Sequence, residues 1–169
     1  AFSSPEIRQV KGDAPESCDP CAVAAEIATL VGYSFRDNAR IRLLTDLLPC
    51  PPVALGSDEL KQILLNLLGN AIQARVESGE IRLSVVHGEG GVLIRVEDTG
   101  PGIVPEILPR ICDPFFTTRA KEGGMGLGLS VVYGIVTKRG GSLQAENQES
   151  GGARLSVFVP LAGEGGRHD

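Results

Sequence analysis

One segment, residues 60–75 (LKQILLNLLGNAIQAR), constrains the fold of this chain more than any other. Leucine, isoleucine and alanine dominate it, and they recur with the three- and four-residue spacing of an amphipathic helix. Four carboxamide residues form a second stripe on the same helix, because they also recur three or four positions apart: Gln62, Asn66, Asn70 and Gln73. Burying an amide without a hydrogen-bond partner costs free energy. The segment therefore predicts a helix that packs into a core while its amides bind each other, the backbone or a ligand.

The composition is that of a folded globular domain. The chain has 169 residues, of which 42% are hydrophobic and 22% are charged, and its net charge is −5. This acidic balance argues against a nonspecific nucleic-acid binder, and no apolar run reaches the roughly 20 residues of a membrane span. The first residues also lack the pattern of a signal peptide. We therefore expect a cytoplasmic protein that neither binds nucleic acid nor inserts into a membrane.

Two of the four cysteines, Cys18 and Cys21, form a CxxC pair, which is a candidate for redox chemistry or half of a zinc site. The two histidines of the chain, His87 and His168, stand alone and complete no ligand set. The pair also precedes a helical pattern, whereas a thioredoxin-like motif follows a strand. We therefore favour reduced thiols that pack as small apolar side chains, with a thiol or metal module as the minor alternative.

The rest of the pattern predicts an α/β domain. Helical spacing also occurs in residues 20–36 and 127–139, and Ser57 is a suitable N-cap for the central helix. Strand patterns occupy residues 41–45, 80–86, 92–98, 142–147 and 153–159. We predict a two-layer sandwich in which about three helices cover one face of a mixed, mostly antiparallel sheet. The long stretch between the third strand and the last helix is of a length that is typical of a functional loop.

A glycine-rich loop, residues 123–130 (GGMGLGLS), leads into that last helix. Glycines allow backbone N–H groups to approach a phosphate closely, and a helix N-terminus favours its negative charge. The loop is neither a Walker A motif, because no Gly-Lys-Ser/Thr follows, nor a Rossmann fingerprint, because no strand runs into it. Glycines that serve only helix packing remain the alternative.

Asp98 ends a predicted strand and is followed by Thr-Gly-Pro-Gly. Its carboxylate either caps the turn or accepts a hydrogen bond from the exocyclic amino group of adenine. Asn66 and Asn70 lie one helical turn apart on the same face. Their amide oxygens suit a hard cation such as Mg²⁺, which commonly bridges phosphate oxygens. The alternative for this pair is a buried amide network or an exposed face.

Together these segments closely resemble the catalytic ATP-binding domain of sensor histidine kinases, in the Bergerat-fold (GHKL) superfamily that includes DNA gyrase. Four motifs of the family occur in order within residues 20–160: the N box at 66–74 (NLLGNAIQA), the first glycine box at 98–102 (DTGPG), the F box at 113–118 (DPFFTT) and the second glycine box at 124–129 (GMGLGL). The PFFTT form and residues 130–135 (SVVYGI) look most like nitrogen-regulation-type kinases. The resemblance implies a Bergerat fold with a long ATP lid.

The resemblance also implies the site residues. Asn66 and Asn70 would hold Mg²⁺ against ATP, and Asp98 would bind adenine. Residues 101–125 would form a mobile ATP lid, anchored by Phe115 and Phe116. Arg119 and Lys121 in the lid would reach the γ-phosphate, with a solvated loop charge as an equal alternative. Further nucleotide contacts would come from Gly100, Gly102, Ile103, Thr118, Gly124, Met125, Gly126, Leu127, Gly128, Leu129 and Ser156.

Two positions depart from the family pattern. Gln73 stands where some members have a lysine that reaches phosphate, and Ser156 stands where many have threonine. The hydroxyl survives at Ser156, so hydrogen bonding on the adenine side is expected to be retained.

The residue at position 66 bears on the reaction. The hydrolytic ATPases of the superfamily have a glutamate one helical turn before the metal-binding asparagine, and Asn66 occupies that position here. Because asparagine is no base, attack by water loses a contribution that is typically about 10²- to 10⁴-fold. The sequence therefore predicts phosphoryl transfer to a histidine on a dimerisation domain, with a response regulator downstream. A non-catalytic nucleotide-binding regulatory module is the alternative.

Neither histidine of the chain matches the acceptor motif, because His87 ends a strand beside a glycine turn and His168 lies near the C-terminus. We therefore expect an isolated, monomeric catalytic domain that phosphorylates itself slowly or not at all. Its expected organisation is a linker from the dimerisation domain (1–17), the catalytic domain (18–162) and a disordered tail (163–169).

Overall fold

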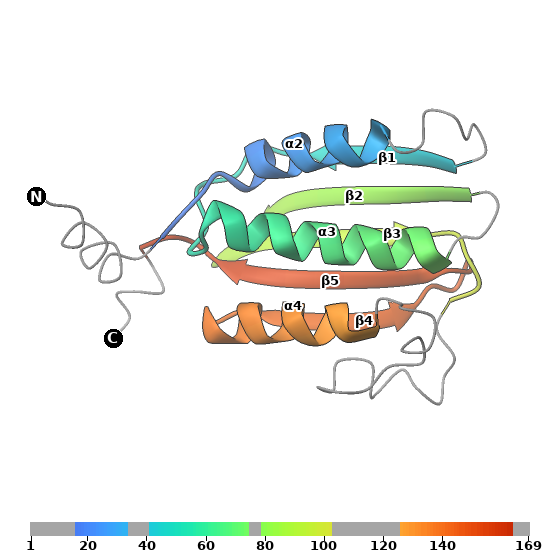
Figure 1. The fold of residues 1–169 in the computed structure, drawn as a ribbon. Coiled ribbons are helices and arrows are strands. Elements are labelled where there is room, and N and C mark those ends of the chain that lie inside the picture. Colours follow the sequence, from blue (N-terminus) through green and yellow to red (C-terminus); the bar gives the residue numbers. More distant parts are fainter. Residues whose placement is uncertain (1–15, 34–40, 75–78, 103–125, 164–169) are drawn as a thin grey trace, which may run out of the picture.

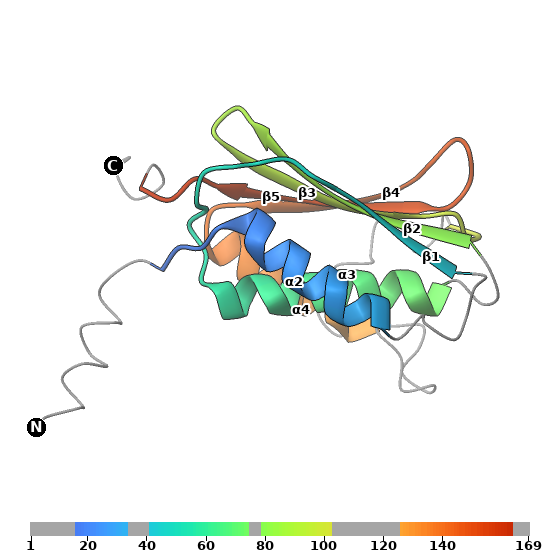
Figure 2. The same ribbon diagram turned by 90° about the horizontal axis from the view of Figure 1, so that it is seen from above.

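The computed structural model describes residues 16–33, 41–74, 79–102 and 126–163. Within these residues the chain forms two layers, an open five-stranded sheet and the helices that cover one of its faces (Figures 1 and 2). The described helices are α2 (Pro20–Tyr33), α3 (Ser57–Ala74) and α4 (Gly126–Lys138). The predicted two-layer α/β sandwich is confirmed.

The sheet has the strand order β1-β2-β3-β5-β4. Its strands are β1 (Ile41–Leu47), β2 (Gly79–Gly88), β3 (Gly91–Asp98), β4 (Ser142–Asn147) and β5 (Ala153–Pro160). β1 and β2 pair in parallel, and every other neighbouring pair in this sheet is antiparallel. Parallel neighbours need a crossover connection, and α3 supplies it between β1 and β2. The sheet is therefore mixed and mostly antiparallel, as predicted.

The hairpin between β2 and β3 is tighter than the sequence pattern suggests. The pattern leaves residues 87–91 unpaired, whereas the strands stay in register as far as the pair Gly88 and Gly91. Two residues then make the turn, and Gly90 has a φ of +80°, a conformation that favours glycine. The difference arises because ladder hydrogen bonds join backbone groups, so pairing continues beyond the last hydrophobic side chain.

The core lies between α3 and the sheet. Six apolar side chains of α3 are at most 2% exposed: Leu60, Ile63, Leu64, Leu67, Leu68 and Ala71. They pack in one cluster with the inward-facing side chains of the three central strands, among them Leu83, Ile94 and Val157. Each large apolar side chain buried in this way contributes about 1.5 to 3 kcal/mol. The apolar face of the central helix is thus the main source of cohesion in the domain.

The described cysteines serve packing. Cys18, Cys21 and Cys50 are free thiols that pack against the core, and the thiols of Cys21 and Cys50 both donate to the carbonyl of Leu48, at 2.6 and 3.1 Å. Burial raises the pKa of Cys18 and of Cys21 to about 11, which disfavours the reactive thiolate. The described part of the chain also contains no group of three or more metal-ligating side chains. The packing contacts and the raised pKa values of Cys18 and Cys21 are those of reduced packing thiols.

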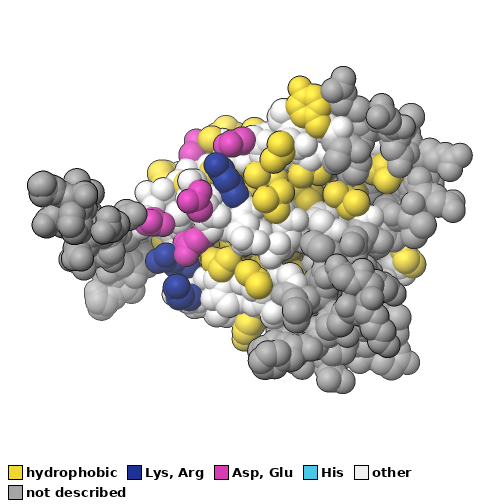
Figure 3. Space-filling model, in the orientation of Figure 1, with side chains coloured by type: hydrophobic (Ala, Val, Ile, Leu, Met, Phe, Trp, Pro, Cys, Tyr) yellow, Lys and Arg dark blue, Asp and Glu magenta, His cyan; other side chains and the backbone are white. Residues whose placement is uncertain are grey.

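The surface of the helical layer is shown in Figure 3. Charged side chains gather toward the end where α3 begins, and two ion pairs lie there, Lys61 with Glu26 at 3.5 Å and Arg139 with Glu59 at 3.0 Å. The helices also expose several large hydrophobic side chains: Leu30, Tyr33, Leu65, Val131 and Tyr133. None of the described helices is long and apolar enough to cross a membrane.

The N-terminus of α3 is capped differently from the prediction. The carbonyl of Gly56 accepts the N–H of Leu60 at 3.0 Å, so Gly56 is the N-cap and Ser57 is already helical. The N-cap assignment of Ser57 was wrong. The carboxylate of Glu59 reaches back to the N–H of Gly56 at 3.2 Å, which is one arm of a capping box. A glycine without a capping side chain serves here because Glu59 binds its N–H group.

Glu59 also joins α3 to α4. Its two carboxylate oxygens accept bonds from Arg139 Nε at 3.1 Å and from a terminal guanidinium nitrogen at 3.0 Å. Burial by itself would raise the pKa of Glu59, but the hydrogen bonds from Arg139 and Gly56 outweigh it, and the net pKa is lowered. This two-bond contact fixes the beginning of α3 against the end of α4.

Replacing Glu59 with glutamine is expected to lower the free energy of unfolding at pH 7 by about 1 to 2 kcal/mol, because the charge-assisted bonds weaken. The pKa of Glu59 is lowered in the folded protein. The wild-type advantage is therefore complete above the ordinary value of 4.5 and disappears as the pH falls through the folded pKa. Urea unfolding of both proteins at pH 7 and pH 3 measures this difference.

Glu26→Gln is the matched control, because the Glu26 side chain is 62% exposed and its ion pair with Lys61 should contribute little. A Glu59→Gln protein as stable as the wild type at pH 7 would contradict the role of this contact.

Candidate functional site

The elements that carry Asn66, Asn70, Asp98 and Gly128 converge at one end of the sandwich. The C-terminal ends of α3 and β3, the N-terminal end of α4 and the hairpin between β4 and β5 all lie at this end, on the right in Figure 1. Helices α3 and α4 pack against each other. Residues that are far apart in the sequence are thereby brought to a single edge of the domain.

Asp98, the last residue of β3, lies in the interior of this edge. It is only 5% exposed and, by the alternation along β3, faces the helices together with Ile94 and Val96. Its Oδ1 atom accepts the N–H of Gly100 at 2.8 Å and the N–H of Ala153 at 3.4 Å. Within the described residues, no hydrogen bond reaches Oδ2. One oxygen therefore anchors the carboxylate while the other is available to a donor.

Two glycines near Asp98 occupy positions where the backbone has a positive φ angle. Gly102, in the first glycine box, has a φ of +87°. Gly152, at the start of β5, has a φ of +90°, and a Cβ atom there would collide with the carbonyl oxygen of Asp98. Sequence reasoning did not assign Gly152 to the site. The signal that could have found it is the pair of glycines, Gly151 and Gly152, directly before a strand.

Asn66 connects the central helix to the second glycine box. Its Nδ2 atom donates to the carbonyl of Gly128 at 3.1 Å, and its Oδ1 atom accepts from Gln62 Nε2 at 3.2 Å. Gly128 belongs to the first turn of α4, and Leu129 beside it is buried in the core. This contact brings the N box next to the N-terminus of α4, which is an electrostatically favourable place for a phosphate.

Asn70 has the opposite character, although it lies on the same helical face. Its Nδ2 atom is buried, and it has no hydrogen-bond partner among the described residues. A buried donor without a partner costs about 1 to 3 kcal/mol. Such a group at the edge of a site is typical of a side chain that binds a ligand.

Several predicted site residues lie outside the described residues: Ile103, Phe115, Phe116, Thr118, Arg119, Lys121, Gly124 and Met125. Gly126 and Leu127 belong to α4, but their side-chain surroundings and those of Gln73 are outside the described part of the structure. Gly100 donates its N–H group to Asp98 and so lies beside that candidate residue.

Ser156 is not brought to the site. It lies on β5 opposite Arg95 of β3 and Gln144 of β4. In this register Ser156 shares a face with Arg95, whereas Asp98 shares the helix-covered face with Val96 and Leu155. Its hydroxyl therefore points to the opposite side of the sheet from the carboxylate of Asp98. We remove Ser156 from the set of nucleotide-binding candidates.

Comparison with known proteins identifies the class to which this fold and site belong. Residues 56–163 match the family described as "Histidine kinase-, DNA gyrase B-, and HSP90-like ATPase", and the chain belongs to this family. Its relatives and its structural matches place it among the ATP-binding catalytic domains of sensor histidine kinases, as the sequence motifs predicted.

Two relatives and one solved structure illustrate the similarity. The chain is 41% identical over 145 residues to the sensor histidine kinase ZraS of Escherichia coli (strain K12), covering 82% of this chain and 31% of ZraS. It is 36% identical over 151 residues to the sensory histidine kinase/phosphatase NtrB of Escherichia coli O157:H7, covering 82% of this chain and 42% of NtrB. The catalytic domain of the histidine kinase ThkA matches with a TM-score of 0.77 and 29% identity, over 87% of this chain and 95% of that domain. The chain thus spans less than half of the length of either relative.

The contrast between the two asparagines predicts opposite effects on stability. Leucine has the same branched arrangement of side-chain heavy atoms as asparagine but no polar group. Asn70→Leu removes an unsatisfied donor and is expected to raise the free energy of unfolding by about 1 kcal/mol. Asn66→Leu removes the hydrogen bond to Gly128 and is expected to lower the free energy of unfolding by about 1 kcal/mol. Urea unfolding without nucleotide measures both, and a loss of stability in Asn70→Leu as large as that in Asn66→Leu would contradict the contrast.

Proposed function

We propose that this domain binds ATP with Mg²⁺ and donates the γ-phosphoryl group to a histidine on a separate dimerisation domain. The observation that carries the proposal is the arrangement at one edge of the fold. A buried carboxylate with one available oxygen, a buried amide without a partner among the described residues, and the N-terminus of a helix all lie at this end of the fold. These three features suit, respectively, a base with an amino group, a phosphate-bound cation and the phosphates themselves.

Asp98 would bind the adenine base. Its Oδ1 atom is held by Gly100 and Ala153, so the carboxylate is oriented before the nucleotide arrives. The Oδ2 atom would then accept a hydrogen bond from the exocyclic amino group of adenine. Guanine presents a carbonyl oxygen at the same edge, which a carboxylate would repel. The site should therefore prefer ATP to GTP.

Asn70, with Asn66 beside it, would hold Mg²⁺. The unsatisfied amide of Asn70 fits this role, because amide oxygens are suitable ligands for a hard cation and the amide N–H group can donate to a phosphate. Bound Mg²⁺ would neutralise charge on the β- and γ-phosphates. Asn66 already uses both ends of its amide within the protein, so Asn70 is the principal ligand in this proposal. The backbone at the start of α4, from Gly126 to Leu129, would face the phosphates.

The lid residues complete the proposed site. Ile103, Phe115, Phe116, Thr118, Gly124 and Met125 would contact the nucleotide or anchor the lid over it. Arg119 and Lys121 would contact the γ-phosphate. These assignments rest on the family motifs alone.

The residue at position 66 favours an external acceptor over water. The hydrolytic members of the superfamily have a glutamate at this position, whereas Asn66 offers no base. The amide of Asn66 is also hydrogen-bonded to Gly128 and Gln62. In the proposed reaction, a nitrogen of the acceptor imidazole forms a bond to the γ-phosphorus as the bond to the β–γ bridging oxygen breaks. His87 is exposed at the end of β2, and we do not assign it as the acceptor.

The proposed partners are the dimerisation domain and a downstream response regulator. The histidine kinase ThkA has been solved in complex with the response regulator protein TrrA, and it resembles this chain with a TM-score of 0.72 and 28% identity. We place the domain in the cytoplasm, since its three described cysteines are free thiols and its proposed substrate is ATP.

The adenine assignment predicts a specific binding defect. Asp98→Asn should weaken the binding of Mg-ATP by about 10- to 100-fold, because the amino group loses a charged acceptor. Purine ribonucleoside triphosphate, which lacks that amino group, should bind wild type and variant to within about threefold. Isothermal titration calorimetry with both nucleotides measures the effect. Equal weakening for the two nucleotides would argue against Asp98 as the adenine-binding group.

The transfer reaction is tested by supplying an acceptor. The chain is mixed with γ-labelled ATP and the dimerisation domains of ZraS and NtrB, with the catalytic domains of those kinases as positive controls. We expect acid-labile label on the added domain with wild type and none with Asn70→Asp. Acid-labile label on His87 or His168 of the chain itself would contradict the external acceptor. A further outcome is that the chain binds ATP tightly but leaves unlabelled a dimerisation domain that the control catalytic domains do label. That outcome would favour a nucleotide-binding regulatory module.

A further inference from the structure

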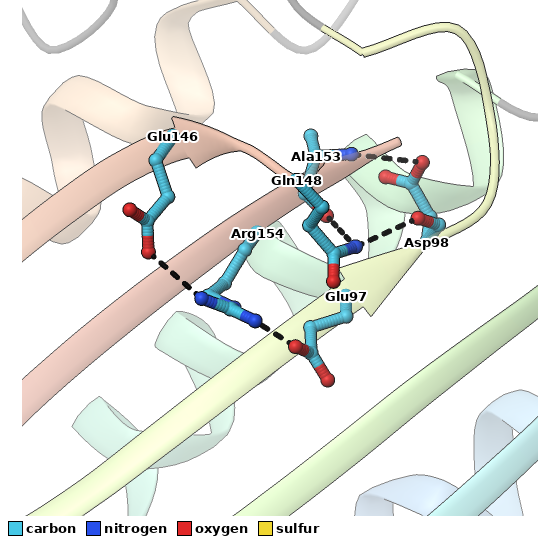
Figure 4. Close-up of polar contacts among 6 residues, drawn as sticks. All are labelled: Glu97, Asp98, Glu146, Gln148, Ala153 and Arg154. Atoms are coloured by element: carbon cyan, nitrogen blue, oxygen red, sulfur yellow. Dashed lines mark hydrogen bonds and ion pairs between the residues drawn. The ribbon is translucent and has the colours of Figure 1, made fainter. Parts of the chain in front are cut away.

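Gln148 lies in the hairpin between β4 and β5, and its side chain bridges the ends of two strands. Its Nε2 atom donates to the carbonyl of Asp98 at 3.2 Å and to the carbonyl of Ala153 at 3.3 Å (Figure 4). A primary amide has two N–H groups, so one side chain can satisfy both carbonyls. The backbone of Gln148 is fixed as well, since its N–H binds the carbonyl of Gly152 at 2.9 Å and its carbonyl accepts from Gly151 at 3.0 Å.

This bridge lies where the sheet itself stops joining β3 to β5. The paired register of these strands ends at Glu97 and Arg154, one residue before Asp98 and Ala153. Beyond that pair, the Asp98 side chain accepts the N–H of Ala153 at 3.4 Å, which is a long hydrogen bond. The backbone of Asp98 is still paired with Ile81 of β2 on its other side. Among the described residues, the Gln148 side chain bonds the backbone of Asp98 to that of β5 after the ladder between β3 and β5 has ended.

The ladder just before the bridge is reinforced on the other face of the sheet. Arg154 of β5 binds Glu97 of β3 at 2.8 Å and Glu146 of β4 at 3.2 Å (Figure 4). These ion pairs tie β3, β5 and β4 together one residue from Asp98 and two residues from Gln148. The ion pairs therefore hold the hairpin that carries Gln148 against β3. The hydrogen bonds of Gln148 in turn fix the backbone of Asp98 relative to this hairpin.

We propose that Gln148 is a positioning residue for base recognition. It holds the main chain of Asp98 so that the available carboxylate oxygen meets the amino group of adenine, and it does not itself contact the nucleotide. The inference rests on the proposed function of Asp98 and extends it to a residue in a different hairpin. A charge-assisted hydrogen bond depends steeply on distance and angle, so a small shift of the Asp98 backbone is enough to weaken it.

The test compares ATP with purine ribonucleoside triphosphate, which lacks the amino group. In the 169-residue chain, Gln148→Leu removes both donors, and it should weaken ATP binding by about tenfold while changing binding of the analogue by less than about twofold. Gln148→Asn keeps an amide but is one methylene shorter, and it should give a smaller loss of the same kind. Calorimetry measures the affinities, and thermal unfolding confirms that each variant is folded.

Gln144→Leu is the matched control, because Gln144 is an exposed glutamine on the adjoining strand β4. Gln144→Leu should change neither the affinity for ATP nor the affinity for the analogue. A purely structural role for Gln148 would weaken ATP and the analogue equally, and that result would overturn the proposal, as would unchanged ATP binding in both variants. If Gln148→Leu does not fold, Gln148→Asn decides by the same comparison of the two nucleotides.

The same measurements separate this inference from the proposed function. If wild type binds ATP and the analogue equally well and Asp98→Asn changes neither, the adenine assignment itself is wrong. If Asp98→Asn abolishes the preference for ATP while the Gln148 variants keep it, the proposed function stands and the positioning role of Gln148 is refuted.

Discussion

The packing of α3 against the sheet is the interaction on which the rest of this structure depends. Leu60, Leu64, Leu67 and the other apolar residues of that face are almost completely buried, and they fix the rotation of the helix about its axis. Once that rotation is set, the amide stripe has to face the neighbouring helix and the edge of the sheet. Asn66 and Asn70 thus reach the site because leucines on the other side of the same helix are buried.

Two polar contacts between α3 and α4 then fix the position of α4. At the start of α3 Glu59 makes a charged, two-bond contact with Arg139, and near the middle of α3 Asn66 binds the carbonyl of Gly128 in the first turn of α4. Two contacts far apart along antiparallel helices restrict sliding and rotation together. The N-terminus of α4 is therefore held beside the N box. An anion bound there could accept hydrogen bonds from both segments. Asn70 has no hydrogen-bond partner among the described residues, and its unsatisfied amide lowers the stability of the domain in the absence of a ligand.

Much of this could be predicted from the sequence, because periodicity and motifs report local chemistry. The strand ranges, the amphipathic central helix and the mixed sandwich follow from which residues alternate and which recur every three or four positions. The family motifs selected Asp98 and the two asparagines as candidate site residues, and the fold brings them to one end of the domain. The prediction was wrong at the cap of α3, where the carboxylate of Glu59 replaced the expected role of the Ser57 side chain. A cap depends on which side chain reaches a backbone N–H group, and residue type alone does not decide that.

The sequence by itself determined the elements, their buried faces and the residue types at the candidate site. The tertiary structure alone decided which of those residues meet. Ser156 and Asp98 lie on opposite faces because the register between β3 and β5 pairs Ser156 with Arg95, and no property of either strand in isolation sets that register. The bridge from Gln148 to Asp98 joins residues 50 positions apart, and a glutamine in a turn gives no sign of its partner. Alternation within a strand is a local property, whereas register and hairpin docking are set by the packing of the whole sheet against α3.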